Sequence, residues 1–182
     1  GGTAKTYGGN ITNSSGILRI YGGEVLGGTC GTYGGSIHNA KTFYMYGGTV
    51  NGNVVLPDVK ANTSNDVPVE IWGCKINGNL DVYKNNEVCL TGAPVISSVT
   101  LHDGVLLSTK NLTKGASIGI ASEGIFTEAS ASVKNYLNYF YGALAATKIT
   151  VRDNALHCGS DYTSDLVFEE GPTNAACPVC HK

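Results

Sequence analysis

The chain has 182 residues, of which 42% are hydrophobic and only 14% are charged, and its net charge is −2. That length suits one ordinary domain with at most a small appendage. A nucleic-acid groove needs clustered cations, and no two Lys or Arg residues are adjacent in the sequence. No apolar stretch approaches the ~20 residues of a membrane-spanning helix. We therefore expect neither nucleic-acid binding nor membrane insertion in this segment.

Glycine-rich turns recur at a fixed interval along the first half of the chain. The tripeptide Tyr-Gly-Gly, with one Trp-Gly-Cys variant, has its aromatic residue at five positions: Tyr7, Tyr21, Tyr33, Tyr46 and Trp72. The spacing from Tyr7 to Tyr33 is 26 residues. The spacings from Tyr21 to Tyr46 and from Tyr46 to Trp72 are 25 and 26 residues. Two interleaved series therefore share one period, which predicts stacked repeat units of about 26 residues.

Asparagines follow the same period. Asn51 recurs 26 residues later as Asn77, and Asn13 is followed by Asn39 at the same interval. Stacked units would place each pair side by side, so we expect amide ladders inside the turns. A calcium site would instead need several converging carboxylates, and the acidic residues of this region are spread over two units.

Short strands are predicted between these turns. Residues 16–23, 42–48, 68–74 and 79–83 alternate apolar with polar or aromatic side chains, as strands do when they bury one face. The predicted inward residues are Leu18, Ile20, Phe43, Met45, Val69, Ile71, Leu80 and Val82. Such short strands cannot bury a face alone, but stacked units can.

We therefore predict an all-β fold, a right-handed parallel β-helix with rungs of about 26 residues. An antiparallel β-sandwich is the competing fold, although it would need no fixed period. A βαβ sheet is disfavoured, because no amphipathic helix of ~12 residues separates the strands.

The period decays after Tyr83. Strand patterns continue at 99–106 and 118–126, and residues 132–140 are predicted to form one or two helical turns that cap the solenoid. Last strands are expected at 149–151 and 155–156. We divide the chain into a parallel β-helix at 1–156 and a tail or linker at 157–182 that contains cysteine and histidine.

Several motifs in the C-terminal half fit a known type of module: residues 90–96 (LTGAPVI), 99–104 (VTLHDG), 112–120 (LTKGASIGI) and the closing Leu156-His157-Cys158. Together they resemble modules of large secreted surface proteins of gut Firmicutes. The matching motifs span roughly residues 85–158, and the Tyr-Gly-Gly units resemble those modules in general character. The resemblance implies a bacterial β-helix of the pectate-lyase-like or adhesin-like type, located outside the cell or on its surface. It implies no particular catalytic residue.

The C-terminal cysteines form a candidate metal site. Cys177 and Cys180 have the C-x-x-C spacing of a zinc knuckle, and Cys158, His157 and His181 are candidates for the other two ligands of a tetrahedral Zn²⁺ site. A disulfide among the three cysteines is the alternative, and oxidising surroundings favour it.

The aromatic series is the candidate binding site. One 26-residue rung would place Tyr21, Tyr46 and Trp72 on one outer face, and Tyr7 and Tyr33 on another. Exposed aromatic rings can hold the apolar face of a sugar. Alternatively, the rings form a ladder that stabilises the solenoid by about 0.2–1 kcal/mol per pair.

Catalytic signatures are weak in this sequence. The only acids closer together than four residues are Glu169 and Glu170, and neither G-x-S-x-G nor H-E-x-x-H occurs. We therefore expect a non-catalytic structural or adhesive scaffold whose partners are glycans or surface proteins. A carbohydrate-binding β-helix and a polysaccharide lyase or hydrolase fragment are the alternatives.

Overall fold

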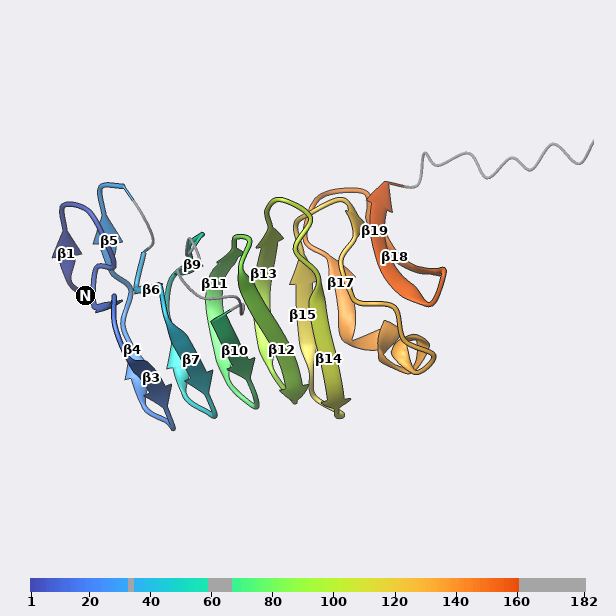
Figure 1. Ribbon diagram of the computed structural model, residues 1–182, viewed down its shortest axis with the longest axis horizontal. Helices are drawn as coiled ribbons and strands as arrows, with labels where there is room; N and C mark the ends of the chain where they lie inside the picture. The colour runs from blue at the N-terminus through green and yellow to red at the C-terminus, as the bar shows by residue number, and fades with distance from the viewer. Residues whose placement is uncertain (33–34, 59–66, 161–182) are drawn as a thin grey trace, which may run out of the picture.

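The computed structural model describes residues 1–32, 35–58 and 67–160. It is mostly β-strand, with parallel sheets stacked as a solenoid of about six turns, and this confirms the predicted parallel β-helix. Figure 1 shows the strands succeeding one another along the long axis, from β1 near the N-terminus to β18 and β19 at the opposite end. Within the described residues, no helix has the length and apolar character needed to cross a membrane.

Two parallel sheets enclose the core. The five-stranded sheet consists of β3 (Ile17–Ile20), β7 (Thr42–Met45), β10 (Val67–Ile71), β12 (Asn86–Gly92) and β14 (Leu107–Leu112). The nine-stranded sheet consists of β2 (Ile11–Asn13), β4 (Glu24–Val25), β6 (Ile37–Asn39), β8 (Thr49–Val50), β9 (Val54–Leu56), β11 (Lys75–Val82), β13 (Val95–Leu101), β15 (Ser117–Ile120) and β17 (Phe140–Gly142). The chain winds around the core and contributes strands to each sheet in turn. Neighbouring strands of a sheet therefore come from successive turns and are parallel.

Smaller elements lie at the two ends of the solenoid. Near the N-terminus, β1 (Thr3–Ala4) and β5 (Thr29–Cys30) pair as a separate two-stranded sheet. At the C-terminal end, β16 (Gly124–Ile125), β19 (Ala155–Ser160) and β18 (Thr147–Arg152) form an antiparallel sheet. The helix η1 (Val133–Tyr139) packs beside it and buries Val133. The predicted capping helix is thus confirmed, although it is a 3₁₀-helix. The predicted boundary at 156/157 falls inside β19, and the division into two parts stays a prediction.

The repeat length changes along the solenoid. In the five-stranded sheet, Leu18 pairs with Phe43 and Phe43 with Val69, and both steps match the period of the Tyr-Gly-Gly turns. The next two steps, from Val69 to Val88 and from Val88 to Leu107, are equal to each other and clearly shorter. The first units are longer because their connections are longer. For example, ten residues separate β9 from β10, whereas three separate β11 from β12. The period seen in the sequence therefore belongs to the N-terminal half, and a rung with short connections needs fewer residues.

The core follows the predicted alternation. Phe43, Met45, Val69 and Ile71 are completely buried. Burying each such side chain contributes about 1.5–3 kcal/mol. Leu18 and Ile20, also predicted inward residues, are only partly buried but pack against this core, while the polar or aromatic side chains between them face outward.

The predicted asparagine ladders are also present. The Asn77 side-chain amide donates a hydrogen bond to Asn51 Oδ1 at 2.7 Å, and Asn13 donates to Asn39 Oδ1 at 2.7 Å. Asn39 is completely buried. The Asn13–Asn39 bond therefore satisfies a buried amide, whereas the Asn51–Asn77 bond lies at the surface of the stack.

Candidate functional site: an exposed aromatic row

The aromatic row consists of Tyr21, Tyr46 and Trp72, which lie on the outer face of the five-stranded sheet. Each residue directly follows a strand, so the parallel register brings the three together. The Tyr46 amide donates to the Ile20 carbonyl, and the Trp72 amide to the Met45 carbonyl, both at 2.8 Å. The predicted stacking on one face is therefore confirmed.

The ring geometry decides how much aromatic surface the row offers. The Tyr21 and Tyr46 ring centroids are 5.1 Å apart with an interplanar angle of 16°, and those of Tyr46 and Trp72 are 6.0 Å apart at 49°. Nearly parallel rings at such a distance are offset-stacked, so they cover part of each other's faces. Tyr21 remains 73% exposed and Trp72 42%, whereas Tyr46, between them, is 36% exposed. The row therefore stabilises the stack and also presents aromatic surface at its two ends.

Further side chains border the row and were not predicted. The Tyr44 ring stacks on Tyr46 at 6.1 Å, and the Arg19 guanidinium lies 5.4 Å from the Tyr44 ring centroid. At the Trp72 end of the row, Trp72 Nε1 donates to Glu70 Oε2 at 3.3 Å. The period-two alternation could have found these residues, because Arg19, Tyr44 and Glu70 occupy the paired outward positions of β3, β7 and β10.

The second predicted pair, Tyr7 and Tyr33, is described only in part. Tyr33 lies outside the described residues. Tyr7 is 45% exposed, and its ring centroid lies 4.6 Å from that of His38, on the side of the nine-stranded sheet. His38 is only 7% exposed, and this burial lowers the pKa of its imidazole below the usual value, since burial disfavours the charged form.

Acidification should therefore weaken the fold through His38. Because the unfolded chain binds a proton to this histidine at higher pH than the folded chain does, the free energy of unfolding should fall as pH drops from above about 6.5 toward the lower folded pKa. One such proton gives a slope of at most about 1.4 kcal/mol per pH unit. Urea unfolding at several pH values should show this slope in the wild type and lose it in His38→Gln. Identical slopes in the two proteins would contradict the expectation.

Of the candidate zinc ligands, only His157 and Cys158 lie within the described residues, both on β19. Cys158 is completely buried in the core, and its Sγ lies 3.8 Å from the Ile120 carbonyl oxygen. Burial raises the pKa of this thiol, which favours the protonated form rather than the thiolate that binds zinc. Cys177, Cys180 and His181 lie outside the described residues. Among the residues that are described, no group of three or more His, Cys, Asp or Glu could hold a metal ion.

A second buried cysteine, Cys74, also favours the protonated thiol. Cys74 replaces the second glycine of its turn and is 3% exposed. Burial raises the pKa of its thiol to about 12, and it forms no disulfide with Cys89 on the neighbouring strand. Cys74 therefore acts as a small apolar core residue.

Comparison with protein-family models, with curated proteins and with solved structures finds no match to this chain.

Proposed function

We propose that this chain is a non-catalytic, adhesive scaffold of a bacterial extracellular or cell-surface protein, and that the aromatic row binds glycans. The observation that supports it most directly is the exposure of Tyr21 and Trp72 at the two ends of a stacked row. Large aromatic side chains that remain in contact with water are a favourable surface for sugar rings, because they bury apolar area on binding at a small cost in conformational entropy.

The border of the row adds hydrogen-bonding groups for sugar hydroxyls. The Arg19 guanidinium has five N–H donors. The Glu70 carboxylate is an acceptor, and one of its oxygens already accepts a hydrogen bond from Trp72 Nε1. The parallel strands fix these side chains on a regular sheet, so the surface is organised before a ligand arrives. A preorganised surface loses less entropy on binding.

A glycan array with mucin-type and microbial polysaccharides tests this function. We expect the wild type to bind at least one glycan, and Trp72→Ala and Tyr21→Ala each to weaken binding about tenfold, equivalent to about 1.4 kcal/mol. Tyr141→Ala is the matched control for Trp72→Ala. Tyr141 is as exposed as Trp72, at 43%, but lies on β17 of the other sheet.

Two results would contradict the proposal. One is the absence of binding to every glycan on the array. The other is an equal loss of affinity in Tyr141→Ala and Trp72→Ala, which would mean that the row has no special role.

A further inference from the structure

The outer face of the nine-stranded sheet carries a second row of side chains. The register pairs Thr12 with His38, His38 with Val55, and Val55 with Asp81, so these residues follow one another across β2, β6, β9 and β11. Their neighbours Ile37, Val54 and Leu80 point into the core and are completely buried. His38 and Val55 are nevertheless only 7% and 6% exposed, so other parts of the chain cover this outer face.

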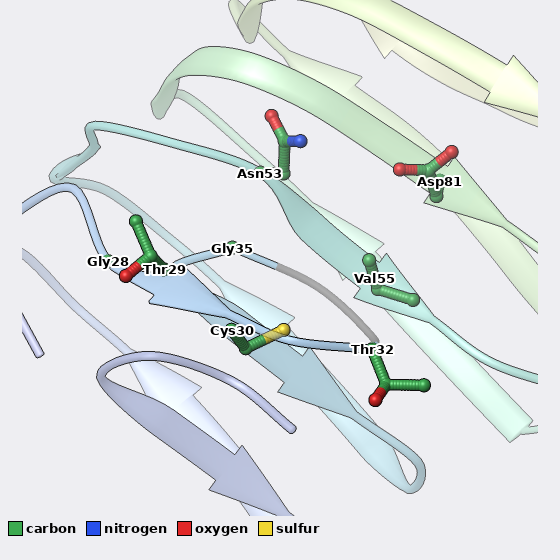
Figure 2. A pocket seen from close by; sticks show the side chains of 8 residues that line it. All are labelled: Gly28, Thr29, Cys30, Thr32, Gly35, Asn53, Val55 and Asp81. Carbon is green, nitrogen blue, oxygen red and sulfur yellow. The ribbon is translucent and has the colours of Figure 1, made fainter. Parts of the chain in front are cut away.

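We call the segments around β1 and β5 the cover: the Tyr7 ring, which follows β1, lies against His38, and Thr29 and Cys30 of β5 line a hollow together with Val55. Ser36 ties it to the solenoid, because its hydroxyl accepts from the Gly28 amide at 3.2 Å and lies 3.1 Å from the Asn51 carbonyl oxygen. A hollow of about 340 Å³ remains between this cover and the sheet. Figure 2 shows residues that line it, with Thr29 and Cys30 on β5, Thr32 just after it, and Val55 and Asp81 on β9 and β11.

A larger hollow, of about 530 Å³, lies farther along the same face. We call it the tyrosine hollow, and it is lined by Tyr7, Thr12, Ser14, His38, Ala40, Pro57, Asp58 and Tyr83. Its size falls within the range of small-molecule sites, and aromatic walls with a few polar groups are typical of such sites.

The tyrosine hollow has a rigid aromatic wall. The Tyr83 ring stacks on His102 with centroids 3.9 Å apart and an interplanar angle of 6°. His102 is itself held by Asp81, with Nε2 and Oδ1 3.3 Å apart. Tyr83 is therefore fixed from behind by a stacked and hydrogen-bonded neighbour, while it lines the hollow.

The lining carries almost no uncompensated charge. Asp58 is the one carboxylate among the described lining residues, and it is paired with Lys84 Nζ at 3.5 Å and with the Asn85 side-chain amide at 2.6 Å. Burial keeps the His38 imidazole neutral near pH 7 because it lowers the pKa. Thr12 and Ser14 add hydroxyl groups, which can donate and accept hydrogen bonds.

We propose that the tyrosine hollow is a second binding site, which takes one uncharged sugar residue between Tyr7 and Tyr83. A neutral sugar offers an apolar ring face for the tyrosines and several hydroxyls for Thr12, Ser14 and Asp58. A charged ligand would enter a hollow that has no opposite charge to offer. The site is independent of the aromatic row, since the two lie on different sheets.

Saturation-transfer NMR with methyl glycosides of glucose, galactose and mannose tests this site, with glucosamine and glucuronic acid as charged probes. We expect saturation transfer from the wild type to at least one neutral glycoside. In Tyr83→Leu, which keeps an apolar side chain, the dissociation constant should be at least tenfold higher. Thr12→Val, which changes one exposed hydroxyl, should weaken binding severalfold. Tyr141→Ala, which removes an exposed tyrosine on β17 away from the hollow, should leave binding unchanged. Trp72→Ala removes one end of the aromatic row and so shows whether the row, rather than the hollow, holds the glycoside.

The outcomes separate this site from the aromatic row. No transfer to any neutral glycoside, a preference for either charged probe, or undiminished binding in both Tyr83→Leu and Thr12→Val would each overturn the tyrosine hollow. Loss of glycoside binding in Trp72→Ala alone would assign the sugar to the aromatic row and also overturn it. A failure of the glycan array, by contrast, leaves the NMR result to decide this site separately.

Discussion

Ile71→Ala should lower the free energy of unfolding by roughly 2–5 kcal/mol. Ile71 is completely buried, and its register partners Met45 and Leu90 on the two neighbouring strands are completely buried as well. Removing its side chain would open a cavity in the middle of three stacked rungs, where hydrogen-bonded strands on both sides limit relaxation. Denaturant unfolding followed by circular dichroism measures the change.

Tyr46→Ala is the matched control for Ile71→Ala, because it removes a larger side chain one rung away on the outer face. Tyr46 is 36% exposed and contacts the rings of Tyr21, Tyr44 and Trp72. Each of the three lost pairs is expected to cost about 0.2–1 kcal/mol, about 0.6–3 kcal/mol in total, so the loss should be smaller than the loss at Ile71. Equal losses would show that the assignment of inward and outward residues is wrong.

The sequence was most informative where one strand repeats another. Alternation of Phe43 with Tyr44 and of Met45 with Tyr46 reveals both faces of a strand, because side chains on a strand point to opposite sides in turn. The recurrence of Tyr-Gly-Gly then supplies the register between strands. Fold, core and aromatic row all follow from these two local signals, and the structure confirms them.

The shortest rungs could not be predicted from the same signals. The Tyr-Gly-Gly period counts a rung plus its long connections, and only the pairing of Val69 with Val88 and of Val88 with Leu107 shows that fewer residues suffice. A connection that leaves the sheet and returns adds residues without changing the register. The period of the sequence therefore overstates the length of a bare rung wherever such connections recur.

The tyrosine hollow was also out of reach of sequence analysis. Its lining residues run from Tyr7 to Tyr83 and carry no shared motif. They meet because four strands stack in register and because the segment after β1 places the Tyr7 ring against His38. Likewise, the burial of Cys158 follows from its place on β19 against the capped end of the core, whereas the sequence shows only its spacing from Cys177.

Asn86→Asp should strongly destabilise the fold although it preserves the shape of the side chain. Asn86 is 4% exposed, and its side-chain amide donates to the carbonyl oxygens of Leu56, Pro57 and Tyr83 at 3.2, 2.9 and 2.8 Å. A carboxylate in its place would turn a negative oxygen toward these carbonyls and leave a buried charge uncompensated, which costs about 3–5 kcal/mol.

The pH dependence of Asn86→Asp gives the test its specificity. The introduced carboxyl would have a folded pKa above its unfolded value, so the folded chain would bind the proton first. The loss of stability should therefore be complete at neutral pH and shrink as pH falls toward the unfolded pKa of about 3.9, because a protonated carboxyl can again donate one hydrogen bond.

Asn111→Asp is the control, since Asn111 is exposed, and a surface change of this kind should stay within about 0.5 kcal/mol. Denaturant unfolding of both variants and the wild type between pH 4 and 7 measures the difference. If Asn86→Asp and Asn111→Asp lost the same stability at pH 7, the buried amide would not be holding the turn between β11 and β12 to the end of β9.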